Sequence, residues 1–149
     1  MTRRTATALA AALALSAGLG LAGCSSSAPE LKVAGAFMPQ PVGDTAGGFL
    51  TVTNTGGTAD RLTSVTSSLS DDVQMHETKD RTMRQVTSLD VPANGELRLE
   101  RGGDHLMFMG IKKQPEQGET IDVELHFEKS EPIRVALPVE ERTHNPKQH

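Results

Sequence analysis

The sequence has no Trp or Tyr, only four Phe and a single Cys, Cys24. A folded core must therefore rest on aliphatic side chains. With one cysteine the chain has no internal disulfide, no thiolate-ligated blue-copper centre and no cysteine-rich zinc site. The His-Glu-x-x-His pattern and phosphate-binding glycine loops are also missing, as is any set of nucleophile, base and orienting residue. We expect that the protein is not an enzyme.

Basic residues are in the minority, with a formal net charge of −4 for the whole chain. Residues 1–23 contain Arg3 and Arg4 and no acid, so the remainder carries 13 basic and 19 acidic side chains and a charge of −6. An acidic surface argues against nucleic acid as a partner.

Residues 1–23 are typical of a bacterial signal peptide. Two arginines precede an apolar run at residues 6–21, which ends in Leu-Ala-Gly before Cys24. Small residues before that cysteine look like a lipobox, so we expect Cys24 to be lipidated and residues 24–30 to form a tether. The domain would then lie outside the cytoplasm, anchored to the membrane. The alternative, a retained membrane helix, fits less well because the apolar run is short.

Helical periodicity is absent from the rest of the chain, and short β-like segments are separated by Gly, Pro, Asn and Asp. The clearest are residues 121–127 and 133–139, where aliphatic and polar residues alternate. About eight such segments predict an all-β sandwich or barrel over residues 31–139. Residues 140–149 are polar and terminal, and we expect them to be disordered.

Two histidines and two methionines stand out against this background. His105 and Met107 are two residues apart, so in a strand they share one face, while Leu106 and Phe108 share the other. His76 and Met83 flank a polar run between two β-like segments, which predicts a hairpin or short loop. Thioether sulfur binds little except soft metals such as Cu(I), and this combination predicts a copper site.

The pattern of a His, a Met and then His-x-Met resembles that of the periplasmic PCu(A)C copper chaperones. Here His76 and Met83 are followed, after the 21 residues 84–104, by His105-Leu106-Met107. Segments 102–110 and 47–56 are also similar to that family. Because the family usually has a longer spacer between the first His and the Met, Met75 is an alternative sulfur ligand to Met83.

The resemblance implies a cupredoxin-like Greek-key fold and a Cu(I) chaperone. It also implies an acceptor: the copper-A centre of a cytochrome c oxidase subunit, often in concert with a Sco-type thiol protein. We expect a monomer.

Two other functions remain open from the sequence: a copper buffering or storage lipoprotein, and a metal-free β-sandwich binding module. His144 and His149 in the tail are candidates for a weak second site for Cu(II), because imidazole suits that ion.

Overall fold

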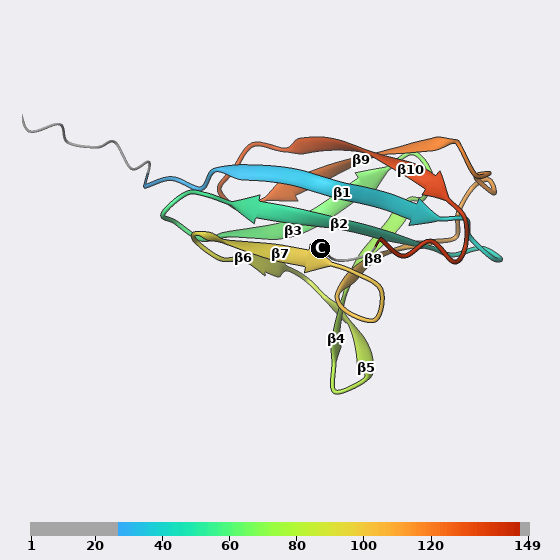
Figure 1. Cartoon of the computed structure of the whole chain (residues 1–149), viewed down its shortest axis with the longest axis horizontal. Helices are drawn as coiled ribbons and strands as arrows, with labels where there is room; N and C mark the ends of the chain where they lie inside the picture. The colour runs from blue at the N-terminus through green and yellow to red at the C-terminus, as the bar shows by residue number, and fades with distance from the viewer. Residues whose placement is uncertain (1–26, 147–149) are drawn as a thin grey trace, which may run out of the picture.

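The computed structural model describes residues 27–146. The leader, Cys24 and His149 lie outside the described residues. The described part is all β, as the sequence predicts, and has no helix. Its strands are β1 (Leu31–Pro39), β2 (Ala46–Asn54), β3 (Asp60–Ser67), β4 (Asp72–Lys79), β5 (Thr82–Val86), β6 (Leu89–Val91), β7 (Gly95–Leu99), β8 (His105–Met109), β9 (Thr120–Phe127) and β10 (Ile133–Glu140) (Figure 1).

The strands follow the order β5-β4-β8-β2-β1-β10-β9-β3-β6, and β7 also pairs with β2. β2 is the branching strand: residues 50–54 pair with β7, whereas residues 46–48 pair with β8. β1 joins β10 in parallel at only two positions, Met38 with Val139 and Pro39 with Glu140. This short junction turns the sheet so that its two halves face each other as a sandwich (Figure 1).

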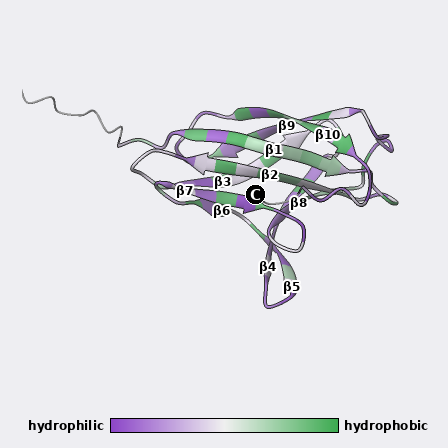
Figure 2. Ribbon diagram, in the orientation of Figure 1, coloured by the Kyte–Doolittle hydropathy of each residue, from purple (hydrophilic) through white to green (hydrophobic). Residues whose placement is uncertain are grey.

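The core is mainly aliphatic, as expected from the lack of Trp and Tyr, and Phe108 is fully buried among the aliphatic side chains. Leu50, Val52, Leu62, Leu125 and Leu137 are at most 1% exposed. Side chains that alternate along each strand bury one face and expose the other, and the mixed colours along single strands in Figure 2 follow this alternation. One face of each outer strand is therefore free to carry functional side chains.

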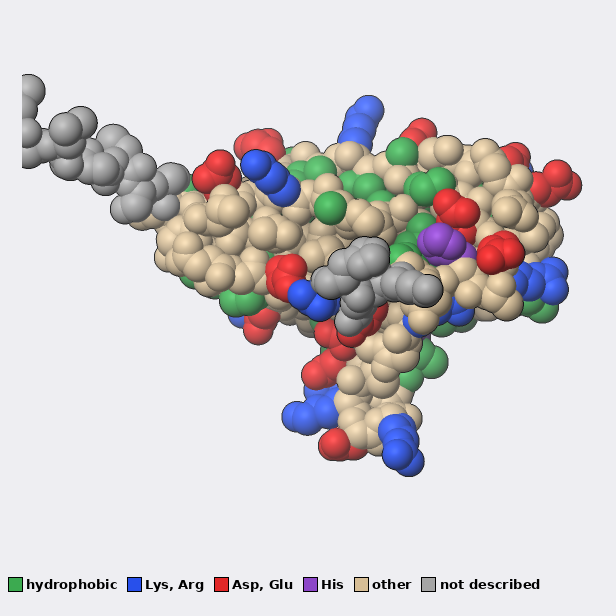
Figure 3. Space-filling view, in the orientation of Figure 1, with side chains coloured by type: hydrophobic (Ala, Val, Ile, Leu, Met, Phe, Trp, Pro, Cys, Tyr) green, Lys and Arg blue, Asp and Glu red, His purple; other side chains and the backbone are tan. Residues whose placement is uncertain are grey.

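The β4–β5 hairpin extends away from the sandwich (Figure 1). The sequence predicts a hairpin here, and the structure confirms it with a turn of only two residues, Asp80 and Arg81. Both have positive φ, 51° and 63°, which is the pattern of a type I′ turn. Figure 3 shows charged side chains gathered on this projecting hairpin.

Two segments differ from the sequence-based expectation. β6 is a strand that the sequence did not indicate, because three residues are too few for alternation to be visible. In the segment expected to be disordered, Glu140 ends β10, and Arg101 donates hydrogen bonds to the backbone carbonyls of His144 (2.8 Å) and Arg142 (2.5 Å). A buried aromatic side chain, Phe37, also packs edge-on against His144. No helix among residues 27–146 is long and apolar enough to cross a membrane.

Candidate metal centre

His76 and His105 lie directly opposite each other on the antiparallel strands β4 and β8. Their ring centroids are 5.3 Å apart. Directly opposed residues project from the same face of a sheet. Met107 is two residues beyond His105 and therefore shares this face. The structure thus brings together three of the four side chains predicted from the sequence, on what we call the ligand face.

The opposite face of the same two strands belongs to the core. Met75 is 5% exposed, and Leu106, directly opposite it on β8, is fully buried. Strand alternation therefore separates Met75 from His76, although the two are adjacent in sequence. The sequence analysis named Met75 as the alternative sulfur ligand. The structure does not place it at the ligand face.

Met83 shares the ligand face but lies at a distance from the other three side chains. It is opposite Thr78 on β5, and its side chain is 52% exposed. β5 and β8 flank β4, so their axes are roughly 10 Å apart, and Met83 is offset from the His pair by a further two residues, about 7 Å. In this conformation Met83 does not contact His105 or Met107.

Met107 lies beside Gly47 of β2 and lines a hollow in the surface. The neighbouring residue on β2 is Gly47, and the ring of Phe49 takes the space that a side chain there would fill, since a Cβ at Gly47 would lie 3.3 Å from Phe49 Cζ. Beside it a shallow hollow of about 300 Å³ is lined by residues that include Val42, Phe49, Met107 and Arg101. A partner can therefore reach Met107 from solvent.

Each imidazole has one nitrogen held by a neighbouring acceptor. His105 Nδ1 lies 2.9 Å from the carbonyl oxygen of Gly103, and His76 Nε2 lies 2.9 Å from Gln74 Oε1. Sequence reasoning did not identify Gln74 or Gly103. Their spacing of two residues from each histidine was the available signal, because such neighbours share a face.

Burial lowers the pKa of His76, and the nearby His105 lowers it further. The neutral imidazole is the form that binds a metal ion. His76 Nδ1 is moreover buried and has no hydrogen-bond partner among residues 27–146. An unpartnered, neutral nitrogen on a face that also carries methionine sulfur fits a soft cation. Among the described residues, no group of three or more His, Cys, Asp or Glu could hold a metal ion.

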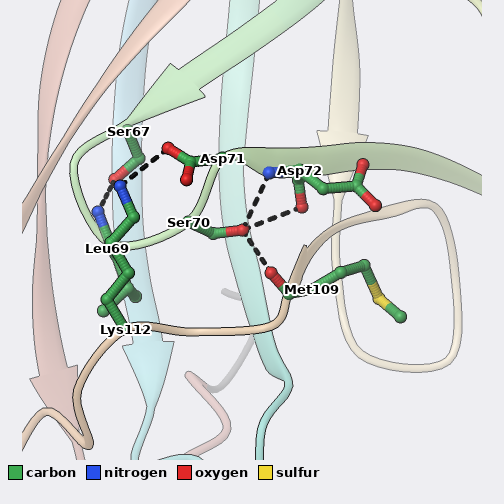
Figure 4. Close-up of polar contacts among 7 residues, drawn as sticks. All are labelled: Ser67, Leu69, Ser70, Asp71, Asp72, Met109 and Lys112. Atoms are coloured by element: carbon green, nitrogen blue, oxygen red, sulfur yellow. Dashed lines mark hydrogen bonds and ion pairs between the residues drawn. The ribbon is translucent and has the colours of Figure 1, made fainter.

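A buried serine fixes how β4 meets β8 (Figure 4). Ser70 is 2% exposed, and its hydroxyl oxygen accepts a hydrogen bond from the Asp72 N–H at 3.0 Å. The same hydroxyl lies within hydrogen-bonding distance of the carbonyl oxygens of Asp72 and Met109. The start of β4 is thereby joined to the end of β8, and this holds the register that sets His76 opposite His105.

Comparisons with known proteins place the chain in a family. A family model described as "LpqE-like: Putative lipoprotein LpqE-like" matches residues 30–139. The chain belongs to this LpqE-like family. A relative called "Putative lipoprotein Lxx21020", from Leifsonia xyli subsp. xyli, is 35% identical over 116 residues, which are 74% of this chain and 66% of that protein. The chain therefore spans slightly less than two thirds of the length of that relative.

Solved PCuAC domains share the fold of this LpqE-like chain. The apo PmoF2 PCuAC domain matches with a TM-score of 0.69 and 22% identity, over 77% of this chain and 93% of that domain. The copper-bound PCuAC domain from PmoF2 matches with a TM-score of 0.67 and 23% identity, over 74% and 92%. CuI-DR1885 from Deinococcus radiodurans matches with a TM-score of 0.64 and 28% identity, over 73% and 77%. The resemblance and the cupredoxin-like β-sandwich expected from the sequence are confirmed.

Proposed function

We propose that this LpqE-like protein is an extracytoplasmic copper chaperone that binds Cu(I) through His76, His105 and Met107. The observation that carries the proposal is the direct pairing of His76 with His105 beside Met107 on one face of the sheet. Two similar solved structures support it, because one is a copper-bound PCuAC domain and the other is CuI-DR1885. No described feature supports catalysis, and we propose a carrier, not an enzyme.

The donors on the ligand face suit a carrier of Cu(I). This ion tolerates low coordination numbers and prefers soft donors. Two neutral imidazoles and a thioether satisfy it without adding negative charge. Because the set contains no thiolate, the ion is held less tightly than in a cysteine site and can pass to an acceptor.

We propose Met83 as the fourth ligand and leave Met75 out of the set. Met83 is exposed, shares the ligand face and lies on the projecting hairpin. Bending of this hairpin over the His pair would bring its sulfur to the ion. The ion would then be closed off from water by Met83 and released when the hairpin swings out.

The finer assignments follow from the resemblance and the sequence. We propose that Cys24 anchors the protein to the outer side of the cell membrane, in agreement with relatives that are called lipoproteins. The acceptor we propose is the copper-A centre of cytochrome c oxidase, reached from the hollow beside Met107. The proposed Cu(I) set does not use His144 or His149 of the tail.

A competition titration with a chromogenic Cu(I) chelator under reducing conditions tests the proposal. The full chain should bind one Cu(I), and Met107→Leu should weaken binding at least tenfold, because leucine keeps the volume but has no sulfur. Met109→Leu is the matched control, since Met109 lies two residues further along the same strand, and it should bind as the wild type does. Equal affinity of the wild type and Met107→Leu contradicts the proposed site.

A further inference from the structure

Three side chains form a hydrogen-bonded row along the ligand face of β4. Asp72, Gln74 and His76 are each two residues apart and therefore project from the same side of the strand. Gln74 Nε2 donates to Asp72 Oδ2 at 3.0 Å, and Gln74 Oε1 lies 2.9 Å from His76 Nε2. Gln74 is also directly opposite Met107 on β8. The four positions Gln74, His76, His105 and Met107 thus form the corners of a rectangle, longer along the strands than across them.

The chemistry of this row fixes the proton on His76. A carboxylate only accepts hydrogen bonds, so Asp72 turns the amide nitrogen of Gln74 toward itself and the amide oxygen toward His76. An amide oxygen also only accepts. His76 Nε2 must therefore carry the ring hydrogen, and in the neutral ring Nδ1 keeps its lone pair.

Nδ1, which keeps this lone pair, is the buried atom of His76 that has no hydrogen-bond partner in residues 27–146. Leaving a buried acceptor unsatisfied destabilises the fold, unless a ligand uses it. His105 has the reverse arrangement: its Nδ1 faces the carbonyl oxygen of Gly103, which only accepts, so in the neutral ring Nδ1 carries the hydrogen and Nε2 keeps its lone pair. The two histidines therefore present different ring nitrogens.

We propose that Gln74, oriented by Asp72, is a positioning residue that holds His76 in its Nε2–H form, so that Nδ1 of His76 and Nε2 of His105 bind the soft metal ion. This inference rests on the proposed copper function. Groups that hold the second ring nitrogen orient a metal-bound histidine and raise its basicity. Gln74 does so without charge and in advance of binding, so no tautomer exchange is needed when the ion arrives.

Nitrogen-15 NMR of the histidine rings reads the tautomers directly. Long-range proton–nitrogen spectra of the full chain in detergent, without metal, should show His76 protonated on Nε2 and His105 protonated on Nδ1. Because Cu(I) is diamagnetic, the same spectra are accessible with the ion bound, and His76 should keep its proton on Nε2. A proton on Nδ1 of His76 in either state overturns the inference.

Three variants separate positioning from packing. Gln74→Leu removes the acceptor, so His76 should become a mixture of tautomers and Cu(I) binding should weaken about tenfold. Gln74→Glu restores an acceptor oxygen and should restore the Nε2–H form. Gln85→Leu is the matched control. Gln85 is the cross-strand neighbour of His76 on β5, the strand that flanks β4 on the side away from β8. Its substitution should change neither the His76 tautomer nor the Cu(I) affinity.

The outcomes distinguish this inference from the function on which it rests. If the wild type binds Cu(I) and Gln74→Leu leaves both the His76 tautomer and the affinity unchanged, the positioning role is overturned while the copper function stands. If the wild type does not bind Cu(I), the proposed function fails and the ligand assignment fails with it. The metal-free spectra then still show whether Gln74 sets the His76 tautomer.

Discussion

At the residue scale, two positions show what the sequence revealed and what it could not. The spacing of His105 and Met107 was enough to place both on one face, because strand alternation is fixed by backbone geometry. The partner of His76 was not predictable, since which residue lies opposite another depends on the register of β4 and β8, and Ser70 helps to set that register. The same limit hid Gln74, whose role follows only from its contacts.

A buried carboxylate far from the ligand face, Asp60, gives a prediction about pH. Asp60 is 3% exposed. Burial raises its pKa, but hydrogen bonds from the Ser130 hydroxyl and from three backbone N–H groups outweigh this effect and lower the pKa below its usual 3.8. The unfolded chain therefore takes up this proton at a higher pH than the folded protein does. Asp60 stabilises the fold fully above the unfolded value, and this contribution is lost as the pH falls through the lower, folded value.

We predict that Asp60→Asn lowers the free energy of unfolding by about 2 kcal/mol at pH 7, because buried donors lose a charged acceptor. The difference from wild type should shrink as the pH falls below about 4. Urea unfolding between pH 3 and pH 7 measures it. Asp90→Asn is the control: Asp90 is exposed and paired with Arg61 on the surface, and its substitution should change stability little. A difference independent of pH would show that the carboxylate charge of Asp60 does not stabilise the fold.

At the element scale, the β4–β5 hairpin and the β3–β4 turn decide how the ligand face is presented. The hairpin carries Met83, and a surface ion pair between Arg84 and Glu77 (2.8 Å) crosses its two strands. The sequence predicted the hairpin because a polar run separates two β-like segments. The tight two-residue turn was not evident, since Asp-Arg lacks the glycine that type I′ turns prefer.

The turn chemistry predicts a stabilising substitution. Arg81 has a φ of 63°, a conformation that costs an ordinary residue about 1–2 kcal/mol. Arg81→Gly removes this strain but increases the entropy of the unfolded chain, so we expect a net gain of about 0.5–1 kcal/mol. Thermal unfolding and hydrogen exchange of the β4 and β5 amides measure the effect. Gln85→Gly, within β5, should instead destabilise the hairpin, and a loss of stability in Arg81→Gly would contradict the turn assignment.

The β3–β4 turn predicts a link between stability and metal binding. Ser70→Ala removes the hydroxyl that joins Asp72 to Met109, so we expect a loss of about 2 kcal/mol and weaker Cu(I) binding from a looser register. Just before this turn, at the end of β3, the Ser67 hydroxyl donates to the Asp122 carbonyl on β9. Ser67→Ala should therefore reduce stability but leave Cu(I) binding unchanged. Denaturation and Cu(I) titration of both variants test this, and identical Cu(I) affinities would contradict a role of Ser70 in the register.

At the scale of the whole molecule, the start of the domain and the ligand face lie at different ends of β2. Leu31, the first residue of β1, pairs with Asn54, whereas Met107 pairs with Gly47. Seven residues of strand correspond to about 23 Å. A protein anchored through the residues before β1 therefore holds its ligand face away from the point where the chain enters the fold (Figure 1).

The overall architecture was largely predictable because it depends on alternation and turn residues, which are local. The join between β1 and β10 and the double pairing of β2 were not, because pairing between distant strands leaves no local pattern. The contacts of the segment after β10 were not predictable for a similar reason: they are with Arg101 and Phe37, both remote in sequence.

The contacts made just before β1 predict that two N-terminal truncations differ in their effect on stability. Removal of residues 1–26 should leave Cu(I) affinity within about twofold of the wild type, because the ligand face is distant. Removal of residues 1–30 also deletes Glu30, whose N–H donates to Asn54 Oδ1 at 3.0 Å. Asn54 is 1% exposed, and the loss of this donor and of the Glu30 carbonyl that accepts from Thr55 should cost about 1–3 kcal/mol. Urea unfolding of the two chains compares them, and equal stabilities would contradict the role of Glu30.

The most direct test of the central claim is X-ray absorption spectroscopy of the full chain loaded with one Cu(I). Binding on the ligand face predicts two imidazole nitrogens together with sulfur from Met107 and, when the hairpin closes, a second sulfur from Met83. Met107→Leu should lose one sulfur neighbour and keep both nitrogens. A wild-type spectrum without sulfur, or one that Met107→Leu leaves unchanged, would show that copper is not bound where His76 meets His105.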